Sequence, residues 1–165
     1  MKISLEARVQ ALEDINEIAR LKSRYLDSGD GGWDRPSHDA DAVLPLLMDD
    51  FSWTGPRFDS MHSAADAEKL WRASRTRIPF AYHLLANPII DVDGDSASGE
   101  WHIMFFATDA GGNELWSAGV YKDRFTRTAS GWKIQSVTVR HAFSGHYRDG
   151  WSSRTAAVLR DRVEA

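Results

Sequence analysis

The chain has 165 residues, of which 42% are hydrophobic and 27% charged, and its formal net charge at pH 7 is −4. This acidic balance argues against nucleic acid as the main partner, because phosphate binding needs a concentrated basic surface. The absence of cysteine excludes disulfides, thiolate nucleophiles, iron–sulfur clusters and cysteine-based zinc sites. The 7 Trp, 7 Phe and 4 Tyr supply aromatic surface that can either line an apolar ligand cavity or fill a core.

Targeting signals are not evident. Charged residues occur early, at Lys2 and Glu6, and the first residues lack the apolar core of a signal peptide. No uninterrupted apolar run approaches the roughly 20 residues that span a bilayer. We therefore expect a cytoplasmic protein with no membrane association, folded as a single domain over residues 1–165.

The N-terminal half is expected to be mainly helical, over residues 1–80. Apolar residues recur at three- and four-residue steps from Leu5 to Tyr25, which predicts a first helix. Glycines at residues 28–32 are expected to end it. A second helix is predicted at residues 40–47, followed by a short strand at 51–54. Ser63 and Asp66 resemble a capping box that opens a third helix.

After the third helix the hydrophobic period changes from helical to alternating. Four long strands joined by hairpin-type connections are predicted, at residues 82–92, 96–108, 114–128 and 132–143. We expect residues 81–143 to form an antiparallel sheet and residues 144–165 a C-terminal tail, with a short helix at 155–163. Helices followed by an antiparallel meander predict an α+β fold, with one face of the sheet packed on the helices.

Few motifs point to cofactor chemistry. The six histidines show neither His-x-x-x-His nor His-x-His spacing, so a metal site would have to be assembled from distant segments. The glycine clusters lack the pattern of a P-loop or a dinucleotide fingerprint, and no Gly-x-Ser-x-Gly elbow is present. We expect no metal and no organic cofactor.

The most informative candidate set is Tyr25, Asp30 and His83. Tyr25 and Asp30 flank the end of the first helix, and His83 lies at the start of the first long strand, so helices folded onto a curved sheet would bring the three together. An imidazole held by a carboxylate is an effective general base near neutral pH, and a nearby phenol can donate a hydrogen bond. The alternative is a core tyrosine, a turn aspartate and a structural histidine.

Further pocket candidates follow from strand parity. Arg140 shares a predicted face with Trp132 and Ile134, where a guanidinium needs an anion. That anion is either a substrate group or a structural partner such as Asp123 or Asp30. The remaining candidates could line a pocket or simply pack in the core, and they are Trp53, Trp101, His102, Phe105 and Tyr121. His102 is the alternative histidine if His83 has a structural role.

Four segments, residues 18–30, 82–88, 119–125 and 131–134, resemble the SnoaL-like branch of the nuclear transport factor 2-like superfamily. The resemblance runs from about residue 5 to residue 148. It implies a cone, in which a curved antiparallel sheet of the cystatin-like α+β barrel type wraps around N-terminal helices and encloses an apolar pocket. A dimer or trimer of identical chains is also implied.

Within that superfamily the pattern is most similar to lyases of the bile acid 7-alpha-dehydratase and scytalone dehydratase type. The resemblance places their tyrosine at Tyr25, their His–Asp base at His83 and Asp30, and an arginine at Arg140. This sequence departs from the lyase pattern on the third strand, where the pattern has an acidic residue and this chain has an apolar one, expected to be Phe105. The identity of the substrate is therefore left open.

The function implied is a cofactor-independent lyase, most simply a dehydratase, acting on a hydrophobic cyclic or aromatic substrate. One alternative is an isomerase, a cyclase or a carbon–carbon lyase that uses the same pocket. Another is a non-catalytic ligand-binding module, similar to the small subunit of a ring-hydroxylating dioxygenase.

Overall fold

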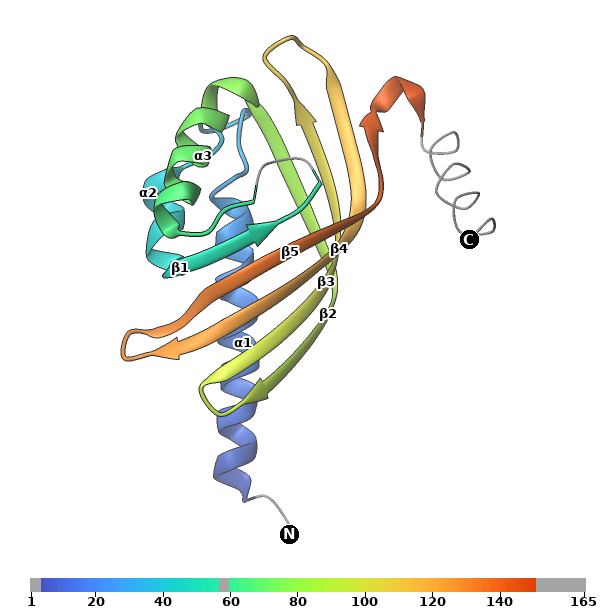
Figure 1. Ribbon diagram of the computed structural model, residues 1–165. Helices are drawn as coiled ribbons and strands as arrows, with labels where there is room; N and C mark the ends of the chain where they lie inside the picture. Colours follow the sequence, from blue (N-terminus) through green and yellow to red (C-terminus); the bar gives the residue numbers. More distant parts are fainter. Residues whose placement is uncertain (1–3, 57–59, 151–165) are drawn as a thin grey trace, which may run out of the picture.

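The computed structural model describes residues 4–56 and 60–150, and the helix expected at 155–163 lies outside them. The chain begins with one long helix, α1 (Leu5–Asp27), which runs along the concave side of a curved sheet (Figure 1). Its N-cap is Ser4, whose hydroxyl accepts a hydrogen bond from Ala7 N at 3.2 Å. None of the described helices is both long and apolar enough to cross a membrane.

The apolar face of α1 is covered along only part of its length. Ile18 and Leu21 are buried in the core, whereas Leu12 remains 67% exposed. The first turns of α1 project beyond the sheet (Figure 1), so the periodicity correctly predicted the helix but not where its packing begins.

The segment after α1 differs from its prediction. A short helix α2 (Ala40–Val43) passes into the 3₁₀ turn η1 (Leu44–Leu46), and the strand β1 (Leu47–Thr54) follows at once. The expected helix at 40–47 is cut short because Pro45 has no backbone N–H to donate within an α-helix. The expected strand at 51–54 therefore begins four residues earlier.

The third helix and the four long strands are confirmed. In α3 (Ala64–Arg77), the Ser63 hydroxyl accepts from Asp66 N, while Asp66 accepts from His62 N instead of closing the capping box on Ser63. Strands β2 (Phe80–Asp93) and β5 (Gly131–His146) extend slightly beyond their predicted limits. Strands β3 (Ser96–Thr108) and β4 (Glu114–Thr128) have the predicted limits.

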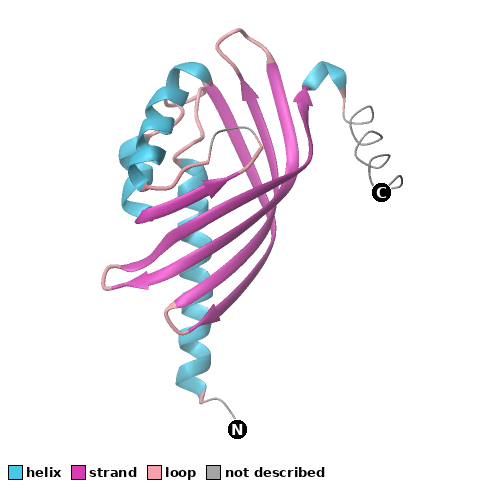
Figure 2. Cartoon of the chain, viewed as in Figure 1, coloured by secondary structure: helices cyan, strands magenta, loops and turns pink. Residues whose placement is uncertain are grey.

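The sheet has the order β1-β5-β4-β3-β2, with the helices on its concave side (Figure 2). Strands β2 to β5 form the predicted antiparallel meander, while β1 pairs with β5 in parallel. The α+β fold with a curved sheet around N-terminal helices is confirmed. Two details differ: the sheet is mixed, and its edge strands β1 and β2 leave it unclosed rather than a full barrel.

A β-bulge in β5 reverses the facing of the residues that follow it, up to a second irregularity between His141 and Phe143. Phe125 pairs with Ile134 but Arg124 pairs with Ser136, which leaves Gln135 as an extra residue. Ile134 therefore points into the core, and so does Val137 rather than Ser136. Because side-chain facing has a period of two, one inserted residue moves Arg140 from the expected inner face to the outer one.

A buried ion pair lies in the centre of the core. Lys22 Nζ and Asp123 Oδ2 are 2.7 Å apart, and both side chains are fully buried. The ammonium also lies 4.7 Å from the ring centroid of Tyr25 and 4.1 Å from that of Tyr121. Neither charged group has another hydrogen-bond partner among the described residues. Each charge therefore depends on the other.

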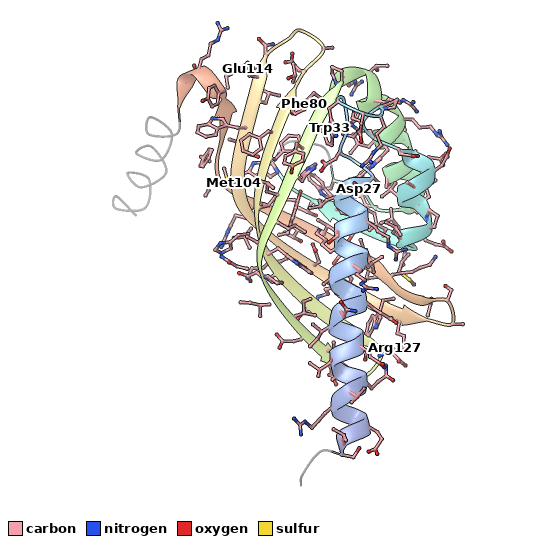
Figure 3. The ribbon with its side chains drawn as sticks, turned by 180° about the vertical axis from the view of Figure 1, so that it is seen from behind. Asp27, Trp33, Phe80, Met104, Glu114 and Arg127 are labelled. Carbon is pink, nitrogen blue, oxygen red and sulfur yellow. The ribbon has the colours of Figure 1, made fainter. Side chains whose placement is uncertain are left out.

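A second ion pair fastens the lower end of the sheet to α1 (Figure 3). Arg127, near the end of β4, donates from Nη1 and Nη2 to the two carboxylate oxygens of Asp14 at 2.8 and 2.7 Å. The indole of Trp132 adds a third hydrogen bond, at 3.2 Å. The hydrogen bond from Arg127 lowers the pKa of Asp14, so the contact persists at neutral pH.

We expect Lys22→Met to lower the free energy of unfolding by about 3–5 kcal/mol, because it leaves the Asp123 carboxylate buried without its partner. The double variant Lys22→Met/Asp123→Leu should regain most of that loss, since no unpaired charge remains. Urea denaturation followed by tryptophan fluorescence measures both. The control is Lys122→Met, which breaks the exposed Lys122–Glu100 pair and should cost under about 1 kcal/mol. Equal losses in the single and double variants would contradict the role given to the pair.

Candidate functional site

A cavity of about 80 Å³ lies between the C-terminal end of α1, α3 and the concave face of the sheet. Most of its wall is apolar, and two histidines from different elements, His38 and His83, also line it. Its aromatic members are Tyr25, Trp53, Trp71, Phe105 and Tyr121. A small, mainly apolar pocket with a few converging polar groups is typical of a ligand site.

Asp30 and His83 are paired at this cavity. His83 Nδ1 donates to Asp30 Oδ1 at 2.5 Å, and His83 backbone N donates to Asp30 Oδ2 at 3.1 Å. Both side chains are nearly buried, at 14% exposure for His83 and 10% for Asp30. A carboxylate can only accept, so Nδ1 carries the proton, and the lone pair of Nε2 is left to act as a base. Phe105 stacks against the imidazole with the ring centroids 4.5 Å apart.

The loop after α1 holds Asp30 in place through glycine. Gly31 and Ala81 exchange two backbone hydrogen bonds of 3.0 Å, which anchors the loop to the start of β2. Gly31 has a φ of +154°, and a Cβ there would lie 2.7 Å from the backbone of Pro36. Only glycine fits this approach, and it places Asp30 directly beside His83.

Two tyrosines contribute hydroxyl groups to the cavity region. Tyr25, on α1, and Tyr121, on β4, are both buried and both line the cavity. Burial raises the pKa of each phenol, and the nearby Asp123 carboxylate raises it further. Both phenols are therefore neutral at physiological pH and able to donate a hydrogen bond.

His38 is a cavity residue that the sequence did not single out. It lies in the loop between α1 and α2. Its ring is edge-on to that of Trp71, with the ring centroids 6.2 Å apart. Burial, and to a lesser extent the neighbouring His83, lower the pKa of His38 to about 4. Nothing in its sequence neighbourhood distinguishes it from the other histidines, because its approach to the cavity depends on loop conformation. Trp71, on α3, also lines the cavity, and the sequence did not single it out either.

Three sequence candidates do not reach the cavity. His102 is exposed on the outer face of β3, with its Nδ1 3.1 Å from Asn87 Nδ2. Arg140 is exposed on the outer face of β5, because the bulge at Gln135 reverses its facing, and it pairs with neither Asp30 nor Asp123. Trp101 is buried in the core beside Lys22 rather than in the cavity wall.

A metal site is not formed by the part of the chain that the structure describes. Within residues 4–56 and 60–150, no three His, Asp or Glu side chains are grouped closely enough to hold a metal ion. The polar groups at the cavity are instead an Asp–His pair, a second imidazole and two phenols, which is a set suited to moving and holding protons.

The low pKa of His38 predicts a pH dependence of stability. Asp30 and His83 are the titratable neighbours that act on it. The unfolded chain takes up the proton at about pH 6.5, before the folded protein does, so stability is complete above that pH and falls towards pH 4. At pH 5 we expect a loss of about 2 kcal/mol relative to pH 7 from this group. His38→Asn should remove this part of the pH dependence of the free energy of unfolding, measured by urea denaturation between pH 5 and pH 7. Identical pH profiles for the wild-type protein and the variant would rule out the effect.

Three solved structures with similar folds are relevant. A provisionally assigned aromatic ring hydroxylase from Novosphingobium aromaticivorans matches with a TM-score of 0.75 and 22% identity, covering 84% of this chain and 96% of that chain. A hexachlorocyclohexane dehydrochlorinase, LinA type 2, has a TM-score of 0.74 and 17% identity, with coverages of 84% and 92%. A provisionally assigned scytalone dehydratase from N. aromaticivorans has a TM-score of 0.72 and 17% identity, with coverages of 82% and 89%.

Sequence comparison adds the family. No curated protein sequence matches the chain. The family model described as the SnoaL-like domain matches residues 10–138, which include most of α1, the loop carrying Asp30 and His38, and most of the sheet. The chain therefore belongs to the SnoaL-like domain family.

Proposed function

We propose that this protein is a cofactor-independent lyase, most simply a dehydratase, that acts on a hydrophobic cyclic or aromatic substrate. The observation that carries the proposal is the Asp30–His83 pair at an apolar cavity, in which Asp30 binds Nδ1 and leaves Nε2 as the lone-pair nitrogen of the neutral ring. Asp30 fixes the tautomer of His83 and stabilises the imidazolium that forms when the ring takes up a proton.

In the proposed reaction, His83 Nε2 removes a proton from a carbon next to a ring carbonyl. The C–H electron pair moves onto the carbonyl oxygen and forms an enolate. When the carbonyl re-forms from the enolate, a carbon–carbon double bond forms and the C–O bond of a hydroxyl on the next carbon breaks. That hydroxyl takes the proton carried by His83 and leaves as water. Tyr25 donates a hydrogen bond to the oxygen that gains charge or leaves, because its raised pKa keeps the phenol protonated. Apolar walls limit access of water to the base.

Two further observations support a lyase. Tyr121 lies beside Tyr25 at the same wall, so a second neutral phenol is available as a donor. Two of the similar structures carry the names of lyases, a dehydrochlorinase and a dehydratase. The role proposed for Arg140 from sequence is withdrawn, because its side chain is on the outer face.

A second candidate function is a ligand-binding or subunit-like module without lyase activity. The similar structure named as an aromatic ring hydroxylase favours this candidate. Isomerisation, cyclisation or carbon–carbon cleavage could also begin with the same proton abstraction. Products separate these possibilities, since dehydration alone removes 18 mass units, the mass of one water, from the substrate.

We expect His83→Ala to lower turnover by at least about 100-fold, because it removes the general base. The assay incubates the protein with single-ring hydroxyketones and follows the loss of water by mass spectrometry. Asp30→Asn should cause a similar loss, while Tyr25→Phe should cost about 10-fold. His102→Ala, which alters an outer-face histidine, is the control and should retain full activity. Wild-type rates in a folded His83→Ala variant would refute the assignment of the base.

The outer face of the sheet supports a proposal that the chain associates with further copies of itself. Leu84 and Met104 are paired across β2 and β3 and are 45% and 38% exposed. Met104 points away from the helices (Figure 3). The exposed Trp33 extends this apolar surface by contacting Phe80 and Tyr82 edge-on. We propose a dimer or trimer that buries this face.

We expect the double variant Leu84→Lys/Met104→Lys to be monomeric, because the charges cannot be desolvated at an apolar interface. Light scattering coupled to size-exclusion chromatography gives the molar mass. The control Arg124→Glu changes an exposed charge elsewhere on the sheet and should leave the oligomer intact. A wild-type protein that elutes as a monomer at micromolar concentration would contradict self-association.

A further inference from the structure

His38 has an unusual backbone conformation for a residue with a side chain. Its φ of +57° lies in the left-handed region, which glycine or asparagine occupies more readily. Flanking hydrogen bonds hold it there: Ser37 Oγ donates to Ile78 O at 2.7 Å, and Asp39 N donates to Ser28 O at 2.7 Å. Strained residues of this kind gather at functional sites. Here the strain directs an imidazole into the wall of the cavity that His83 also lines.

The two ring nitrogens of His38 are in different environments. Nδ1 is fully buried and has no hydrogen-bond partner among the described residues. A buried N–H without an acceptor is less well tolerated than a buried lone pair, so the neutral ring carries its proton on Nε2. Because burial lowers the pKa of His38 to about 4, the ring is neutral at pH 7. The imidazole therefore has one N–H to offer. Because Nδ1 is enclosed, Nε2 is the ring nitrogen that remains for a ligand in the cavity that His38 lines.

We infer that His38 recognises an oxygen atom of the substrate by donating a hydrogen bond from Nε2, in the cavity that the proposed base His83 also lines. This inference rests on the proposed function and deepens it. The two histidines then have opposite tasks: the lone pair of His83 Nε2 removes a proton, and the N–H of His38 holds the oxygen on which negative charge develops. A neutral imidazole can serve as such a donor without transferring its own proton.

The inference also narrows the substrate class. A hydrogen-bond donor fixed in an apolar wall favours a ligand with an oxygen at that point, because a ligand without one leaves the N–H unpaired. Carbonyl and hydroxyl oxygens are strong acceptors, whereas ring hydrocarbons are not. A cavity of about 80 Å³ has room for little more than one ring. The substrate class is therefore a single oxygenated ring.

Phenol and toluene are matched probes, because they differ only in the hydroxyl that replaces a methyl group. Trp53 and Trp71 line the cavity, so quenching of tryptophan fluorescence reports binding. We expect phenol to bind the wild-type protein about tenfold more tightly than toluene. His38→Leu should remove most of this preference. His38→Asn should keep part of it, since asparagine tolerates the left-handed conformation and supplies an amide donor.

A second measurement observes the wild-type protein directly. Long-range ¹H–¹⁵N spectra of histidine-labelled wild-type protein distinguish the two tautomers, and His38→Asn assigns the signals. We expect His38 to be neutral at pH 7 with its proton on Nε2, and phenol to shift that resonance. A proton on Nδ1, a charged ring, or a phenol preference that survives His38→Leu would overturn the inference. Repeating the titrations in His83→Ala separates recognition from turnover: loss of activity with an unchanged phenol preference supports both roles.

Discussion

The contact between Asp30 and His83 is the interaction on which the site depends. It joins the loop after α1 to the start of β2, across 53 residues of sequence, and uses both the ring and the backbone N–H of His83. The contact is possible because Gly31 approaches the strand closely enough to exchange backbone hydrogen bonds with Ala81. The geometry of the proposed base and the anchoring of the loop therefore depend on the same contacts.

Burial gives the polar groups around this contact different tasks. The Lys22–Asp123 pair lies beneath the two tyrosine rings, and the Asp123 carboxylate helps to keep both phenols protonated. Among the described residues His38 has no carboxylate ion pair, and burial keeps it neutral, whereas His83 is held by Asp30. In the proposed function, the two histidines of this cavity therefore act as a base and as a hydrogen-bond donor.

The two faces of the sheet are chemically distinct. The concave face carries the cavity, the ion pair and the aromatic core, while the outer face carries exposed apolar residues such as Leu84 and Met104. His102 and Arg140 belong to this outer face, which removes them from the proposed chemistry. The proposed function and the proposed self-association therefore use opposite sides of the same strands.

Hydrophobic periodicity and turn residues predicted the α+β fold and the four long strands, because both are local signals. The candidates Tyr25, Asp30 and His83 followed from where the first helix ends and the first long strand begins. The side of the sheet that Arg140 occupies was decided by a bulge, which no periodic pattern reveals. The position of His38 was decided by a left-handed residue held by distant backbone groups. Both depend on contacts between segments far apart in the chain, which only the tertiary structure brings together.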